Sequence, residues 1–154
     1  MDVNYKKAFE WCEKAAKQGH ALAQSYLAAM YGEGKGVDVN YKKAIEWCEK
    51  AAEQGDAVAQ YNLGCMYYHG KGVDVNYKKA VELYEKAAEQ GYADAQYSLG
   101  VMYENGQGVD RSDSMALRWF AMATKQGNNS AQAAINEILA KRRSSNQANE
   151  KLAP

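Results

Sequence analysis

The sequence has no long apolar run, and nothing in it approaches the roughly 18 consecutive apolar residues that mark a membrane-spanning helix. Its first residues, MDVNYKKAFEW, also lack the basic-then-apolar pattern of a secretory signal. We therefore expect no membrane insertion and a cytoplasmic location. Removal of a signal peptide ahead of this N-terminus would instead indicate the periplasm or secretion.

Net charge is absent too. The chain carries 19 Lys and Arg against 19 Asp and Glu, so its formal net charge is zero. A balanced chain produces no long-range positive field that would attract nucleic acid or an anionic membrane surface. We therefore expect no nucleic-acid partner.

Cysteine is scarce and odd in number, with only Cys12, Cys48 and Cys65. This count is far from that of a disulfide-stabilised domain and favours reduced thiols. Cys65 and His69 are four residues apart, but two ligands cannot close a zinc site. A Cys-His nucleophile would also need an orienting group and an oxyanion hole, and neither is identifiable. We predict no catalytic residue and no metal.

What the sequence does contain is one 36-residue motif, written three times almost verbatim as residues 1–36, 37–72 and 73–108. A looser fourth copy spans residues 109–144. A fixed period of this size is the signature of a solenoid, in which each unit buries its apolar face only against its neighbours. We predict a single repeat domain over residues 1–143 and a disordered tail over residues 145–154, which is polar and aperiodic.

Each copy contains two helices. Ala8, Trp11, Cys12 and Ala15 follow the i, i+3, i+4, i+7 spacing of an amphipathic helix over residues 5–18. The N-caps and the glycines that end these first helices recur in all four copies: Asn4, Asn40, Asn76 and Ser112; Gly19, Gly55, Gly91 and Gly127. The second helices are predicted over residues 21–31, 57–68, 93–104 and 129–142. The short connections make consecutive helices antiparallel neighbours.

Glycine has two further uses in the motif. Gly64 and Gly100 lie within second helices, where glycine costs about 1 kcal/mol relative to alanine and therefore needs a packing reason. We expect them to admit the small residues Ala44, Ala80 and Ala116 of neighbouring helices. Glycine pairs such as those in GEGKG and GKG follow no strand, so we interpret them as helix stops rather than phosphate loops and expect no cofactor.

One position supports this interpretation of the packing. Cys12, Cys48, Tyr84 and Phe120 occupy the same place in successive copies. A position that accepts cysteine and aromatic residues is typical of a buried core, so we expect these cysteines to be small hydrophobic residues rather than reactive thiols.

The run Y-x-K-A-x-x-W-x-x-K-A-A-x-x-G followed by A-x-A-Q-Y-x-L-G-x-M-Y-x-x-G-x-G-V resembles the SEL-one-like repeat, a relative of the tetratricopeptide repeat. The resemblance covers residues 1 to about 143. It implies an all-α, right-handed α-solenoid of antiparallel helix pairs, in a family that serves mainly as non-enzymatic adaptors and scaffolds for protein–protein interaction. It also implies that the second helices line a concave groove, so we expect a protein or peptide partner there.

Positions that vary between copies are the candidates for contact with this partner. They form a stripe along the second helices, and tyrosine is the kind of rigid aromatic side chain that dominates binding hot spots. Asn62 is added because related clamp-type repeats use asparagine there to bind a peptide backbone or carboxylate. Alternatively, the tyrosines cover the seams between repeats. The candidate residues are Val58, Tyr61, Asn62, Cys65, Tyr68, His69, Asp94, Tyr97, Val101, Glu104 and Asn105.

The resemblance also implies that the helix over residues 5–18 lacks the partner that would normally precede it. Either the chain is a fragment of a longer array, or the apolar flank around Phe9 and Trp11 is covered by a second chain, giving a homodimer through the N-terminal helix.

Two alternative functions remain at this stage. One is a cell-wall or penicillin-interacting enzyme, by analogy with a cysteine-rich branch of the family. The paired cysteines of that branch would fall on Ala52 and Gln60, where this chain has none, and the sequence contains no Ser-x-x-Lys to supply an acylating serine. The other is a self-assembling or designed repeat scaffold.

Overall fold

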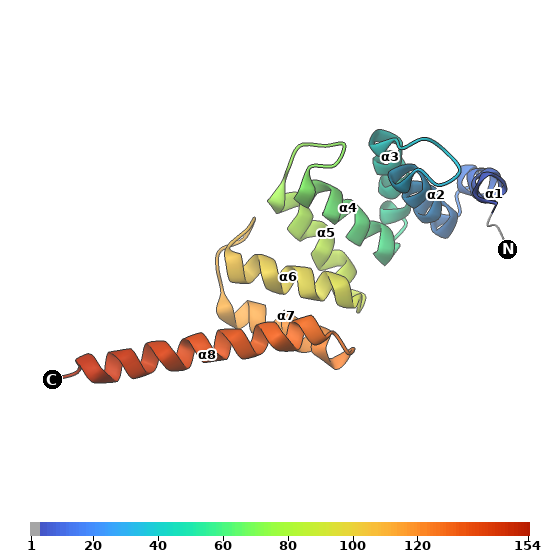
Figure 1. Ribbon diagram of the computed structural model, residues 1–154. Coiled ribbons are helices and arrows are strands. Elements are labelled where there is room, and N and C mark those ends of the chain that lie inside the picture. Colours follow the sequence, from blue (N-terminus) through green and yellow to red (C-terminus); the bar gives the residue numbers. More distant parts are fainter. Residues whose placement is uncertain (1–3) are drawn as a thin grey trace.

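The computed structural model describes residues 4–154, and in this range it contains helices and no strands (Figure 1). The first helices of the helix pairs are α1 (Tyr5–Lys17), α3 (Tyr41–Glu53), α5 (Tyr77–Glu89) and α7 (Asp113–Lys125). The second helices are α2 (Ala21–Glu33), α4 (Ala57–His69), α6 (Ala93–Asn105) and α8 (Asn129–Leu152). The predicted all-α solenoid of antiparallel helix pairs is confirmed. None of the helices in residues 4–154 is both long and apolar enough to cross a membrane.

The helix ends follow from local chemistry. Asn40 caps α3, since its Oδ1 accepts a hydrogen bond from the Lys43 amide at 3.1 Å, and the equivalent Asn4, Asn76 and Ser112 do the same for their helices. Each of the second helices α2, α4 and α6 ends at a glycine in the left-handed conformation, for example Gly34 at φ 70°. The glycine pairs are therefore helix stops, as predicted.

The mid-helix glycines face large side chains rather than the small ones we predicted. A Cβ added to Gly64 would lie 2.6 Å from Cε1 of Tyr84, and one added to Gly100 would meet the ring of Phe120. In the first junction between repeats the corresponding pair is Ala28 and Cys48, which belong to one apolar cluster. At each junction, the small residue on the second helix leaves a space that a side chain of the following first helix fills. Glycine leaves room for an aromatic ring, and alanine leaves room for a cysteine.

The partners predicted for these glycines, Ala44, Ala80 and Ala116, are fully buried but lie elsewhere in the junction. Cys48, Tyr84 and Phe120 are at most 3% exposed, so the prediction of one shared core position is confirmed in the last three copies. Cys12, in the first copy, is only partly buried.

A glutamine crosses every junction. Nε2 of Gln24 donates to the Ala16 carbonyl at 3.1 Å, and its Oε1 accepts from Nε2 of Gln54 at 2.8 Å. One side chain on α2 thus connects the end of α1 to the end of α3. The same two hydrogen bonds recur at Gln60 and Gln96, with Gln90 and Gln126 as donors. We call this series the glutamine ladder.

The disordered tail predicted over residues 145–154 is wrong, because α8 continues to Leu152 (Figure 1). The Oγ atoms of Ser144 and Ser145 donate to carbonyls one turn earlier, at 3.2 and 3.0 Å. Residues 141–154 are all exposed. The lack of an apolar stripe in this segment correctly indicates the lack of burial, but it does not exclude a helix of alanine, glutamine, glutamate and lysine.

The fit between the small residue and the side chain that packs against it can be tested by replacing the residues of one junction with those of another. Gly64→Ala should lower the free energy of unfolding by about 1–3 kcal/mol, because overpacking against Tyr84 outweighs the better helix propensity of alanine. The double variant Gly64→Ala, Tyr84→Cys copies the Ala28–Cys48 pair. Urea unfolding should show it to be less destabilised than the sum of the two single variants. Strict additivity would contradict the size match.

The glutamine ladder makes a second prediction. Gln60→Ala removes two hydrogen bonds at a buried position, and we expect it to lower the free energy of unfolding by about 1–3 kcal/mol. Gln132 is the matched control, since it is the same repeat position but exposed, and its amide donates to Asn136 of its own helix. Gln132→Ala should change stability by less than about 0.5 kcal/mol. Equal losses in the two variants would show that the ladder contributes nothing.

Candidate partner-binding groove

The second helices α4 and α6 lie on either side of α5, and a cavity of about 240 Å³ opens between them. We call it the aromatic pocket. Its lining is Tyr61, Cys65, Tyr68 and His69 from α4, Tyr84 from α5, and Tyr97, Ser98, Val101 and Met102 from α6. Six of the residues predicted for the groove meet here: Tyr61, Cys65, Tyr68, His69, Tyr97 and Val101. The stripe pattern therefore located residues that share one hollow.

Tyr84 forms the floor of the aromatic pocket. Its ring lies against Gly64, and its hydroxyl donates to Sγ of Cys65 at 3.4 Å. The Tyr61 ring packs on Tyr84 and on Tyr92, with ring centroids 5.6 and 5.2 Å apart. Burial raises the pKa of both the Tyr61 and the Tyr84 phenol above the ordinary tyrosine value. The phenols stay neutral at physiological pH, so the pocket offers aromatic surface rather than charge.

A second cavity, also about 240 Å³, lies one repeat earlier between α2 and α4. We call it the N-terminal pocket. It is lined by Ala28, Ala29, Gly32, Glu33, Tyr41, Cys48, Asn62, Cys65, Met66, His69 and Lys71. Shifting its lining by one 36-residue period reproduces much of the aromatic pocket, for example Cys48 onto Tyr84 and Asn62 onto Ser98. The two pockets are thus copies of one site, with α4 as their shared wall.

The two copies differ in chemistry. Ala29 and Gly32 in the N-terminal pocket stand where the aromatic pocket has Cys65 and Tyr68. The N-terminal pocket instead carries the charges of Glu33 and Lys71. It therefore favours a polar or charged group, whereas the aromatic pocket favours an apolar one.

At the third junction, Val101 and Tyr97 pack against an apolar cluster that contains Phe120 and Ile138. Tyr97 also packs on Phe120, with ring centroids 5.6 Å apart.

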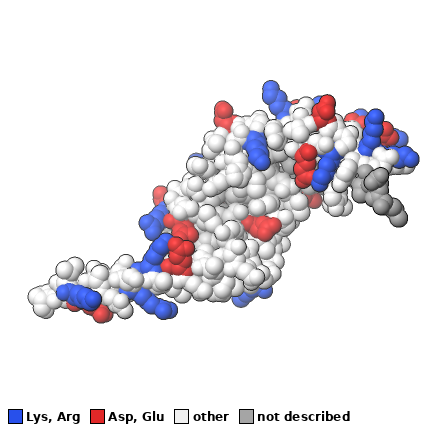
Figure 2. Space-filling view, viewed as in Figure 1, with Lys and Arg blue, Asp and Glu red and all other residues white. Residues whose placement is uncertain are grey.

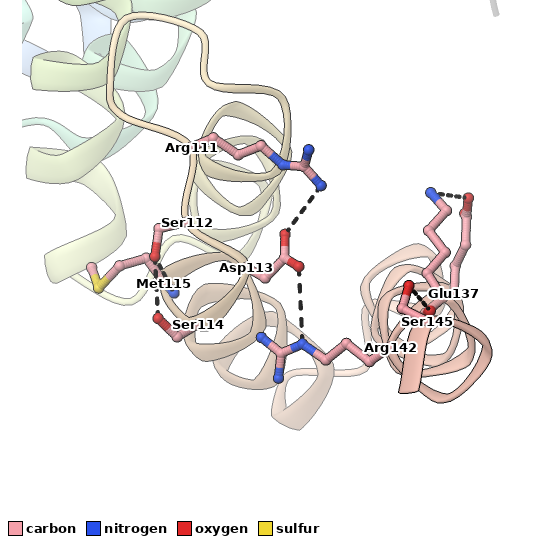
Figure 3. A network of polar contacts seen from close by, with 9 residues as sticks. Arg111, Ser112, Asp113, Ser114, Met115, Glu137, Arg142 and Ser145 are labelled. Atoms are coloured by element: carbon pink, nitrogen blue, oxygen red, sulfur yellow. Dashed lines mark hydrogen bonds and ion pairs between the residues drawn. The ribbon is translucent and has the colours of Figure 1, made fainter. Parts of the chain in front are cut away.

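Glu104 lies beside a charged cluster where the loop before α7 meets α8 (Figure 3). The Asp113 carboxylate pairs with Arg111 at 3.6 Å and with Arg142 at 3.9 Å. The three side chains remain open to solvent, with Asp113 the least exposed at 32%, and ion pairs near the surface contribute little to stability. Figure 2 shows acidic and basic groups side by side in this region, while much of the middle of the same face carries neither.

The remaining predicted residues are dispersed. Val58 is 41% exposed near the start of α4, and Asp94 is exposed near the start of α6, beside the turn after α7. Asn105 is exposed at the end of α6. The sequence reasoning missed Tyr84, Ser98 and Met102 as pocket residues. Gly64 could have indicated Tyr84, because a glycine within a helix often marks the place where a bulky side chain packs against the helix.

Cys65 and His69 each contact an aromatic side chain. The thiol accepts a hydrogen bond from Tyr84, and the exposed His69 ring packs edge-on against Tyr68 at 4.9 Å. Within residues 4–154, no three or more His, Cys, Asp or Glu side chains come together in a way that could hold a metal ion.

The two residues predicted for self-association differ in environment. The Phe9 ring packs edge-on against Tyr31 of α2, with centroids 5.4 Å apart, so its partner is within the chain. Phe9 remains partly exposed, so its part in self-association stays a prediction. Trp11 is 71% exposed, and its ring contacts the Lys14 ammonium 5.3 Å away. The exposed apolar flank is therefore centred on Trp11 alone.

The 36-residue period, the helix pairs and the glycine-ended second helices agree with a known family. The family model for the Sel1 repeat matches residues 1–20, 21–56, 57–92 and 93–128. The chain belongs to the Sel1 repeat family. In the family's own division, each unit starts with a second helix of our pairs and ends with the next first helix. α1 is thus the closing half of a unit.

Solved structures agree with this assignment. A Sel1 repeat protein from Oxalobacter formigenes is 36% identical, with a TM-score of 0.83 over 90% of this chain and 56% of that chain. A protective antigen of uropathogenic Escherichia coli with an SLR fold is 35% identical, with a TM-score of 0.86 over 90% of this chain and 30% of that one. Helicobacter pylori cysteine rich protein B shares the fold at 23% identity and a TM-score of 0.69, over 84% of this chain and 96% of that one. No curated protein sequence gave a match.

The position of Tyr61 in both the seam and the pocket gives a third prediction. Because its ring packs on Tyr84 and Tyr92, Tyr61→Ala should lower the free energy of unfolding by about 2 kcal/mol. Tyr26 is a control tyrosine, also on a second helix and 59% exposed, and Tyr26→Ala should have little effect. Urea unfolding measures both. Similar small losses would mean that Tyr61 contributes no packing and serves the surface only.

Proposed function

We propose that the chain is a non-enzymatic protein-interaction scaffold that holds a segment of a partner protein along α2, α4 and α6. Sel1 repeats generally serve as such scaffolds. The observation that supports this groove in particular is the pair of equivalent pockets, one repeat apart, that share α4 as a wall.

Two pockets of different chemistry suit a partner segment with two anchors. An aliphatic or aromatic side chain fits the aromatic pocket between Tyr61, Tyr68 and Tyr97, where burial of apolar surface supplies the affinity. A polar side chain one repeat away fits beside Glu33 and Lys71. Asn62 projects into the same N-terminal pocket and supplies an amide for the backbone of the segment.

An enzyme of the penicillin-interacting kind receives no support from the site residues. The positions that would carry paired cysteines are built into the repeat framework instead, since Gln60 is a rung of the glutamine ladder bonded to the Ala52 carbonyl.

Photo-crosslinking tests the groove directly. A benzophenone amino acid at Ser98 points its reactive group into the aromatic pocket, whereas the same group at Ala121, exposed on α7, lies on the side of the first helices. In cells of the source organism, we expect one protein to crosslink from Ser98 and not from Ala121. Crosslinking from both positions alike would contradict the groove.

Calorimetry with the purified partner then tests the pocket itself. Ser98→Tyr fills part of the cavity and should weaken binding about tenfold or more, since it displaces the apolar anchor. Ala121→Tyr should bind with unchanged Kd. Circular dichroism must show equal unfolding midpoints for the two variants. Unchanged affinity in an equally stable Ser98→Tyr variant would exclude the aromatic pocket as the binding site.

A further inference from the structure

The first helices carry tryptophan at one repeat position, except in the third copy. The four residues are Trp11, Trp47, Leu83 and Trp119. The Trp47 ring packs against the apolar cluster that contains Ala16 of α1 and Leu27 of α2. The Trp119 ring packs in the same way between α5 and α7, against the cluster that contains Ala88. An indole therefore covers the apolar surface at the α1–α3 and the α5–α7 junctions.

The α3–α5 junction has Leu83 in this place and is left open. Ala52, the repeat equivalent of Ala16 and Ala88, is partly exposed, whereas those two alanines are 1% and 0% exposed. A cavity of about 190 Å³ lies here, with Ala52, Leu63 and Leu83 as its apolar lining. We call it the outer pocket. Within residues 4–154, its lining shares no residue with the aromatic pocket or the N-terminal pocket.

The outer pocket is large enough for an aromatic ring, since a cavity of about 150 Å³ suffices to bind benzene. The flanking junction shows what holds such a ring at the rim, because Nζ of Lys50 lies 4.5 Å from the centroid of the Trp47 ring. Lys86 is the repeat equivalent of Lys50 and lines the outer pocket. A ring bound there would gain the same cation–π attraction.

The opposite side of the rim favours an indole over other rings. Glu49 and Glu53 of α3 line it, and a carboxylate accepts the hydrogen bond that an indole N–H donates. Phenylalanine and leucine side chains have no such donor. The outer pocket thus combines an apolar floor, a cation for the ring face and an acceptor for the ring nitrogen.

We propose that the outer pocket binds a tryptophan side chain of a partner protein. The indole takes the place that Trp47 and Trp119 take in the flanking junctions, on Ala52 and Leu63 and beside Lys86. This site is separate from the groove of the proposed function, because it uses different residues, and either site can exist without the other.

Methyl NMR of the native chain tests the chemistry, with N-acetyl-tryptophan amide as the probe. We expect saturable ring-current shifts of the Leu63 and Leu83 methyl groups, with a Kd on the order of 1 mM for a fragment of this size. N-acetyl-leucine amide should bind at least tenfold more weakly. The absence of saturable shifts, or equal binding of the two amides, would overturn the proposal.

Two further outcomes concern the source of the ring. Free indole that binds at least tenfold more tightly than N-acetyl-tryptophan amide would show that the pocket excludes a peptide main chain, which contradicts a partner side chain. Shifts of Leu63 that depend on protein concentration without any probe would show that a second copy of this chain fills the pocket, and would also contradict the proposal.

The chain offers a pair of reciprocal variants. Leu83→Trp supplies the missing indole from the chain itself, so it should abolish the response of Leu63 to the probe and raise Tm by about 2 °C or more. Trp47→Leu should open an equivalent pocket one repeat earlier, so that the methyl groups of Leu27, which is fully buried in the native chain, now respond. Circular dichroism establishes that each variant is folded.

Both variants can contradict the assignment. An unchanged response of Leu63 in folded Leu83→Trp would place the probe elsewhere. A folded Trp47→Leu variant in which Leu27 does not respond would show that the exchange of tryptophan for leucine is not what creates the site.

Discussion

The structure depends on the contact between each second helix and the first helix that follows it. Two devices make this contact specific. A small residue on one helix admits a residue of matching size on the other, as with Gly64 and Tyr84, and the glutamine ladder connects three consecutive helices through a single side chain. Within residues 4–154, the main contacts between helices join helices of the same repeat or of neighbouring repeats, and stability comes from these contacts. A defect at one junction therefore weakens the whole array.

This contact between repeats also explains which features of the fold could be predicted from the sequence alone. Caps, glycine stops and antiparallel pairs were predictable, because each depends on residues close together in the chain, such as Asn40 and Lys43. The residue that packs against Gly64 could not be predicted, because it lies in the next repeat and the residue type at that position differs from junction to junction. The end of α8 was missed for another reason. An apolar stripe in a sequence indicates a helix with one buried face. The last part of α8 is exposed on all sides, so its sequence contains no such stripe.

The candidate groove was partly predictable for a similar reason. Comparison of repeat positions separated the framework, including the buried Gln60, from variable positions such as Cys65 and Tyr68 that line a pocket. It could not show that Glu104 lies beside the charged residues Arg111 and Arg142, because that depends on how the third and fourth repeats pack together. Tyr61 packs on Tyr84 in the seam between repeats and also lines the aromatic pocket, so a role in the seam does not exclude contact with a partner.

Tyr84 shows how stability and recognition are coupled in this chain. Its ring fills the space left by Gly64. The same residue lines the aromatic pocket, where its hydroxyl donates a hydrogen bond to Cys65. One repeat earlier, Ala28 and Cys48 fill the same junction with less aromatic surface, and the pocket above them is more polar. A change in the size match at a junction therefore also changes the pocket over it. A solenoid of near-identical repeats can in this way present different pockets on a constant framework.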